Sequence, residues 1–325
     1  MHCSVLQFGG GQFLRSFVDL FVEQARRSGQ DIGDVVVVQS TVSSRAKYFN
    51  SQPNGYHVLI RGIVDGHSVE RVEPVRVIRR AIVAEETWKE VQSVALQESI
   101  KWIVSNATEA GYVLEADDFI ARPRSFPAKV ASILFSRYNA GLSGMNILPC
   151  ELLTENGKRL YELVSKQAET WKLSEDFFNW LASECIWADT LVDRIVSRPP
   201  PDHPLLGQDR LLTVAEPFAF WGIQAKKEMP LFEHPSIFRV DDLTPFTMRK
   251  LRILNGAHTA LVCRAMPRGF VTVREAMEDG ATRSWLEQLL FEEIVPVVEK
   301  TTTDAKDFAG SVLDRLANPY LDHKF

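Results

Sequence analysis

Short hydrophobic runs and amphipathic stretches alternate through the first part of the chain. Residues 4–8 (SVLQF) form an apolar run that ends at three glycines. Residues 35–38 (VVVV) form a continuous β-branched run, which is typical of a strand buried on both faces of a parallel sheet. The apolar residues between these runs recur at helical spacings of three and four: Phe13, Phe17, Leu20, Phe21 and Ala25. The order of strand, glycine turn, helix and buried strand predicts a βαβ unit.

More strands are expected before residue 240. Residues 56–82 alternate apolar and polar positions, which predicts a β-hairpin or meander inserted after the first unit. Buried strands are predicted at three further runs: 102–106 (WIVSN), 145–149 (MNILP) and 191–196 (LVDRIV). Three consecutive prolines within residues 198–204 cannot continue a helix or a central strand, so this segment is a connector. Residues 212–223 are again strand-like.

From Thr244 onward the spacing of apolar residues is helical. Helices are predicted at four segments: 245–264, 271–278, 282–299 and 304–316. We therefore expect an α/β nucleotide-type domain over residues 1–240, followed by an all-helical domain over residues 241–325 that carries the catalytic and substrate groups. A length of 325 residues is consistent with two domains.

Composition narrows the class of protein. Hydrophobic residues make up 45% of the chain and charged residues 24%, with a net charge of −5, so neither nucleic acid nor an anionic membrane is an expected partner. No apolar run reaches the ~18 residues of a membrane span, and the N-terminus lacks the basic start of a signal peptide. Four scattered cysteines and seven histidines show no metal-ligand spacing, so we expect reduced thiols, a cytoplasmic location and no metal site.

The segment KLRILNGAH, residues 250–258, carries the most chemistry. At about 100° per residue, Lys250, His258 and Asn255 lie at roughly 0°, 80° and 140° around a helix, so their side chains can face one pocket. An amine that exchanges a proton, beside an amide and an imidazole that bind one oxygen, suits carbonyl–alcohol redox chemistry. The alternative is a solvated helix face. Asn255 and Gly256 count against it, because both are poor residues in the middle of a helix.

The glycine turn, FGGGQFLR, has the context of a dinucleotide site. Gly9 allows a tight turn, and Gly11 lets the backbone approach a pyrophosphate, although Leu14 replaces the third glycine of the usual fingerprint. A plain strand–helix turn is the alternative. The strand at 35–38 is followed by Gln39 and Ser40 rather than an acid that would bind the adenosine ribose of NAD. Gln39 is a candidate to bind a ribose hydroxyl, and Ser40 with Arg45 could accommodate a 2′-phosphate, so NAD is expected and NADP is not excluded.

These segments together resemble the mannitol dehydrogenase, or long-chain polyol dehydrogenase, family. The similar segments occur in order along the chain: FGGGQFLRSF, SNATEAG (105–111), FPAK (126–129), DTLVDRIV (189–196) and KLRILNGAH. The resemblance implies a Rossmann-type dinucleotide-binding domain followed by a helical domain, a nicotinamide cofactor and no catalytic metal. It also implies that Lys250 is the general acid/base, with Asn255 and His258 binding the reacting oxygen.

The resemblance assigns further residues. Around the glycine turn it implies that Gln12, Phe13 and Arg15 bind the cofactor, and near the nicotinamide it implies the same for Asn106, Thr108 and Glu109. Candidate substrate-binding residues are Glu151, Asp193 and Lys129. The alternative for Asp193 is a structural network with Arg194.

One segment indicates the substrate. PCELLTENG (149–157) has Leu152 where the mannitol and fructuronate branches carry an asparagine, and it is similar to the branch that interconverts D-altronate and D-tagaturonate with NAD. The chain ends at NPYLDHKF, whereas relatives continue with helical sequence that carries substrate-binding residues, so we expect a shortened helical domain. Two alternatives remain open: a dehydrogenase for another polyol or hexuronate, and a truncated nucleotide-binding protein without turnover. Oligomeric state is not predicted.

Overall fold

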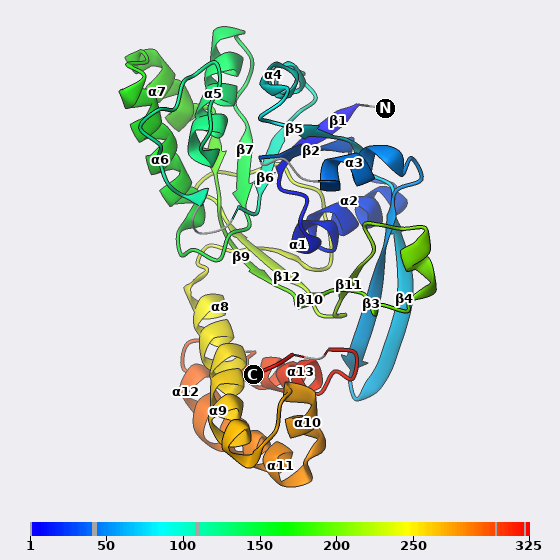
Figure 1. The fold of residues 1–325 in the computed structure, drawn as a ribbon. Helices are drawn as coiled ribbons and strands as arrows, with labels where there is room; N and C mark the ends of the chain where they lie inside the picture. The colour runs from blue at the N-terminus through cyan, green and yellow to red at the C-terminus, as the bar shows by residue number, and fades with distance from the viewer. Residues whose placement is uncertain (1, 41–43, 108–110, 303, 322) are drawn as a thin grey trace.

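The computed structural model describes residues 2–40, 44–107, 111–302, 304–321 and 323–325. Figure 1 shows sheets flanked by helices in the first part of the chain and a separate group of helices below them, formed by the residues after Thr244. The predicted order of an α/β domain followed by an all-helical domain is confirmed.

A six-stranded parallel sheet forms the centre of the first domain. Its strands, in spatial order, are β5 (Ile78–Val83), β2 (Asp34–Gln39), β1 (Cys3–Phe8), β6 (Trp102–Ser105), β7 (Asn146–Pro149) and β8 (Ile186–Trp187). Numbered by their sequence within this sheet, the strands run 3-2-1-4-5-6, which is the order of Rossmann-type dinucleotide-binding domains. The order reverses between β1 and β6, so a crevice is expected at the carboxyl ends of these two strands.

Both faces of this sheet are buried, which explains the continuous apolar run of β2. Val35 and Val37 face one hydrophobic core, and Val36 and Val38 face the other. The first core is covered by α1 (Gln12–Arg15), α2 (Val18–Arg27) and α3 (Ser44–Ser51). The second is covered by α4 (Trp88–Ala95), α5 (Phe126–Asn139), α6 (Asn156–Thr170) and α7 (Glu175–Ser183). The first predicted helix is therefore two helices, interrupted at Ser16 and Phe17.

Two smaller sheets extend the domain. One has the order β10 (Val196–Ser197), β11 (Thr213–Ala215), β3 (Tyr56–Val64), β4 (His67–Val75), and the other β13 (Ile237–Arg239), β12 (Phe220–Gln224), β9 (Asp189–Asp193). The predicted hairpin is correct for β3 and β4, which pair antiparallel, but not for β5, which joins the parallel sheet beside β2. In the connector after β10, Pro204–Gly207 form a 3₁₀ turn.

The helical domain has its own hydrophobic core. Its segments are α8 (Thr244–Arg249), a π-helical turn (Lys250–Asn255), α9 (Gly256–Ala265), a 3₁₀ turn (Met266–Arg268), α10 (Val273–Glu278), α11 (Gly280–Gln288), a second π-helical turn (Leu289–Ile294), α12 (Val295–Val298) and α13 (Ala305–Leu316). A capping box between Thr272 and Glu275 fixes the start of α10. Within the described ranges, no helix is long and apolar enough to cross a membrane.

Asp19 on α2 is buried beneath the glycine turn and makes stability depend on pH. Tyr56 Oη donates to its Oδ2 at 2.9 Å, and burial raises the pKa of Asp19 to about 7. The folded carboxyl keeps its proton where the unfolded one has lost it, so the free energy of unfolding falls as pH rises from about 4 to 7.

Asp19→Asn should remove this loss, because an amide carries no charge. We expect the variant to be more stable than the parent by up to about 4 kcal/mol at pH 8, and by less at pH 5. Thermal unfolding at both pH values measures the difference. Asp307→Asn, at an exposed position on α13, is the matched control and should show no such dependence. An equal effect of Asp19→Asn at pH 5 and pH 8 would contradict the assignment.

Candidate active site

The glycine turn has the shape that a dinucleotide requires. Gly9 has a φ of +112°, which favours glycine, and its amide donates to Val38 O at 3.0 Å. A Cβ at Gly10 would lie 2.7 Å from the ring of Phe49, whereas a Cβ at Gly11 would meet nothing within 4 Å. The turn is therefore packed below Gly10 and open at Gly11, where the sequence predicts the approach of a pyrophosphate.

Three side chains that the resemblance assigned to the cofactor support the turn. Arg15 is buried, and its Nη1 donates to Gly10 O at 2.9 Å. Gln12 Nε2 donates to Ser197 O at 2.9 Å, and Phe13 stacks on Phe17 with ring centroids 4.7 Å apart. The interactions in the structure give these residues a part in fixing the turn, and direct contact with a cofactor stays a prediction.

The strand ends around the β1–β6 crevice meet at Asn106. Its backbone nitrogen donates to Phe8 O at 3.1 Å, and its side-chain Nδ2 donates to Cys150 O at 2.7 Å. This one residue therefore links the ends of β1, β6 and β7. Gln39 is buried at the end of β2, followed by the half-buried Ser40. Thr108 and Glu109 lie outside the described residues.

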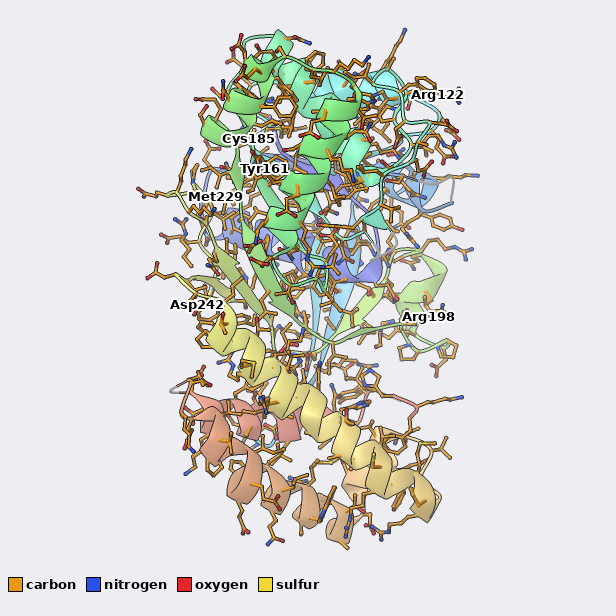
Figure 2. The ribbon with its side chains drawn as sticks, turned by 90° about the vertical axis from the view of Figure 1, so that its left-hand side faces the viewer. Arg122, Tyr161, Cys185, Arg198, Met229 and Asp242 are labelled. Carbon is orange, nitrogen blue, oxygen red and sulfur yellow. The ribbon has the colours of Figure 1, made fainter. Side chains whose placement is uncertain are left out.

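A cavity of about 350 Å³ lies between the end of β7, the strand β9 and the helical run that begins after Asp242, which Figure 2 shows crossing the lower part of the molecule. Its lining includes the loop after β7, β9, Gln224 and one face of the helical run. The residues with polar side chains are Glu151, Thr154, Glu155, Asp189, Thr190, Gln224, Thr244, Thr247, Lys250 and Asn255. The two domains therefore share one cavity.

Lys250 is held at this cavity by the first domain. Its Nζ donates to Val192 O on β9 at 2.8 Å. The pKa of Lys250 is lowered, mainly because burial disfavours the charged ammonium, while the carboxylate of Asp193 opposes the shift. A lowered pKa makes the neutral amine, which can accept a proton, more available near physiological pH.

The KLRILNGAH segment is not the regular α-helix that the sequence interpretation assumed. Lys250 and Asn255 both line the cavity, but His258 is not among its described lining residues and lies on α9 near His323. The prediction assumed a regular α-helix, whereas residues 250–255 form a π-helical turn. Because π-helical bonds join residues i and i+5, the turn brings Asn255 over Lys250. The place of His258 at the reacting oxygen stays a prediction.

Glu151 lines the cavity but already has two partners. Its Oε1 accepts from Ala107 N at 2.7 Å, and its Oε2 accepts from Tyr112 Oη at 2.9 Å. Burial raises the pKa of Glu151. Its position supports a role in holding the loop after β7 against β6, and contact with a substrate stays a prediction.

Asp193 and Lys129 lie away from the cavity lining. Asp193 forms a buried, two-bond ion pair with Arg315 on α13, at 2.8 and 3.0 Å. The alternative of a structural network is correct in part: Asp193 pairs with Arg315 rather than Arg194, and Arg194 donates to the backbone oxygens of Ser16 and Glu216. Lys129 is buried on α5, where its Nζ donates to Arg124 O at 2.6 Å. Neither candidate is among the described lining residues of the cavity, although the carboxylate of Asp193 acts on the charge of Lys250.

Asn156 is a positioning residue that the sequence interpretation did not assign. Its Nδ2 donates to the backbone oxygens of Pro149, Glu151 and Thr190, and its Oδ1 accepts from Thr190 N at 2.8 Å. It thus fixes the loop after β7 against β9. The neighbouring Gly157 allows the close approach, because a Cβ there would lie 2.2 Å from Ala188 O. An Asn-Gly pair shortly after the predicted strand 145–149 was the available signal.

Within the described ranges, no group of three or more His, Cys, Asp and Glu side chains is arranged to hold a metal ion. A Rossmann-type sheet, an open glycine turn at its switch point and a lysine-containing cavity against a helical domain are typical of two-domain dehydrogenases that use a dinucleotide.

Comparison with known proteins identifies the family. Residues 3–232 match the mannitol dehydrogenase Rossmann domain and residues 242–325 match the mannitol dehydrogenase C-terminal domain, so the chain belongs to the mannitol dehydrogenase family. It is 38% identical to an altronate oxidoreductase of Halalkalibacterium halodurans and 36% identical to one of Bacillus subtilis, over 98% of this chain in both cases. The chain spans 66% and 70%, respectively, of the length of these relatives.

Two solved structures of polyol dehydrogenases share the fold. The mannitol 2-dehydrogenase of Pseudomonas fluorescens, in a ternary complex with NAD and D-mannitol, superposes with a TM-score of 0.81 at 20% identity. A substrate-free D-sorbitol dehydrogenase superposes with a TM-score of 0.85 at 22% identity. Both comparisons cover 100% of this chain, and 70% and 72% of the other chains.

Proposed function

We propose that this protein is an NAD-dependent oxidoreductase that interconverts D-altronate and D-tagaturonate, with Lys250 as the general acid/base. The observation that carries the proposal is a buried lysine with a lowered pKa in a cavity that borders the end of β7. The names of the curated relatives support the sugar acid, and the NAD bound to the mannitol 2-dehydrogenase supports the cofactor.

The residues present fit a dinucleotide. Gly9 and Gly11 would hold the pyrophosphate at the open face of the turn, and Gln39 with Ser40 would lie toward the adenosine ribose, which leaves NADP as an alternative. When bound, the nicotinamide accepts a hydride from the alcohol carbon in oxidation and returns it in reduction.

The chain's own residues move the proton. In oxidation the neutral amine of Lys250 takes the proton of the substrate hydroxyl as the carbon–hydrogen bond breaks. In reduction the ammonium returns the proton to the carbonyl oxygen, which becomes the hydroxyl. Val192 O holds Nζ in place. Asn255, brought over Lys250 by the π-helical turn, would donate a hydrogen bond to the same oxygen and stabilise its developing negative charge.

A neutral polyol is a second candidate substrate, favoured by the charge of the cavity. Its described lining has three carboxyl groups, on Glu151, Glu155 and Asp189, and a single cationic side chain, on Lys250. Such a lining suits hydroxyl groups better than a substrate carboxylate, because like charges repel.

Oxidation of NADH, followed by absorbance with tagaturonate, fructuronate and fructose side by side, tests both candidates. The proposal expects tagaturonate to give the highest kcat/KM, and a preference for fructose would support the neutral polyol instead. A parallel series with NADPH decides the cofactor. NADH binding without turnover of any of the three would overturn the proposal in favour of a nucleotide-binding protein.

A further inference from the structure

A buried charge network lies behind Lys250, outside the described lining of the cavity. Arg315 on α13 binds two carboxylates: Asp193 at the end of β9, and Glu216, which follows β11. Its Nε and Nη2 donate to Glu216 at 2.9 and 2.8 Å. The side chains of Glu216 and Arg315 are 1% and 3% exposed, so water does not screen these charges.

Glu216 also fixes the backbone next to the reacting lysine. Its Oε1 accepts from Ile195 N at 2.6 Å, and its own amide donates to Ile195 O at 3.0 Å. Ile195 lies three residues after Val192, whose carbonyl holds Lys250 Nζ. The position of the lysine therefore depends on a strand end that Glu216 and Arg315 hold from behind.

We propose that Glu216 is a positioning residue for the candidate reaction, which together with Arg315 and Asp193 sets the charge state of Lys250 from outside the substrate cavity. This inference rests on the proposed function of Lys250. The two carboxylates share Arg315, and the buried guanidinium of Arg194 lies against the backbone of Glu216. Both carboxylates favour the ammonium form of Lys250, and Arg315 opposes it.

The other charged groups around Lys250 come from three places. Arg249 precedes it on the same helix, Asp189 lies on β9, and Glu151 and Glu155 lie in the loop after β7. Burial lowers the pKa of Lys250, and Asp193 and Glu216 oppose this effect while Arg315 adds to it. Removing one buried negative charge should therefore lower the pKa of Lys250 further.

A matched pair of variants separates charge from shape. Glu216→Gln removes the charge and nearly keeps the shape, whereas Glu216→Asp keeps the charge and shortens the side chain. In the oxidation direction, we expect the pH limb of kcat/KM that reports the neutral lysine to move about one pH unit lower in Glu216→Gln. It should stay at the parental pH in Glu216→Asp, even if kcat falls.

The titration of Lys250 Nζ, followed by ¹⁵N NMR of lysine-labelled protein and assigned with Lys250→Arg, tests the inference without turnover. A parental protein without dehydrogenase activity would overturn the proposed function, while the NMR titration would still decide the role of Glu216. An unmoved titration in folded Glu216→Gln overturns the inference, as does an equal shift in Glu216→Asp, which would assign the effect to geometry. Far-ultraviolet circular dichroism and NADH affinity establish that the variants are folded.

Discussion

Lys250→Ala is expected to lower kcat by at least about 10³-fold with the preferred substrate, while the affinity for NADH stays close to that of the parent. The physical reason is that Nζ is the group positioned to exchange the proton, and general acid–base catalysis contributes about 10²–10⁴-fold. The glycine turn that would bind the cofactor is built from β1 and α1 and does not involve this side chain. Steady-state kinetics and a fluorescence titration with NADH measure the two quantities.

The matched control is Lys306→Ala, which makes the same chemical change at an exposed position on α13. It should retain parental kcat and KM. Near-normal turnover in Lys250→Ala would remove the lysine from the mechanism. A parallel loss of NADH binding would instead indicate that the substitution disturbs the domain.

Arg315→Met should lower the free energy of unfolding by about 3–5 kcal/mol, because it leaves the carboxylates of Asp193 and Glu216 buried without their shared cation. Burial already raises the pKa of Glu216, and pairing with Arg315 opposes that rise. Urea denaturation at neutral pH measures the loss. Lowering the pH should reduce it, since protonation of the two carboxyl groups removes the buried charges.

Two variants serve as controls for this prediction. Arg283→Met removes an exposed arginine that pairs with Glu287 on the surface of α11, and its effect should stay within about 1 kcal/mol. The triple variant Asp193→Asn, Glu216→Gln, Arg315→Met removes all three charges and should recover most of the stability lost in Arg315→Met. A loss as large in the triple variant would assign the effect to packing against Phe218, over whose ring Arg315 lies.

Local pattern predicted four of the six strands of the central sheet: β1, β2, β6 and β7. Strand β8 was not predicted. The continuous apolar run at 35–38 indicated a strand buried on both faces, which the two cores confirm, and the glycine turn follows β1 where the strand order reverses. The hairpin at 56–82 was over-extended, because strand-like alternation does not reveal which sheet a strand joins. Only long-range pairing places β5 beside β2.

The candidate site was predicted in part. One cavity is lined by Lys250, Asn255 and Glu151. These residues could be predicted because the motif and the strand end are visible in the local sequence. The partner of Asp193 could not be predicted, because Arg315 is 122 residues away in the sequence and reaches it only through the docking of α13. Figure 1 shows α13 lying beneath the sheets near the β3–β4 hairpin, where Asn318 Nδ2 donates to Arg61 O.

The π-helical turn at Lys250–Asn255 aligns two candidate reacting side chains but makes the helix less regular. Such a turn holds one residue more than an α-helical turn, at the cost of poorer backbone hydrogen bonding. The same residues in an unbroken α-helix from Thr244 to Ala265 would form a more regular helix. Asn255 would then lie about 140° around the helix from Lys250, so the irregular turn is a structural cost retained at the reacting groups.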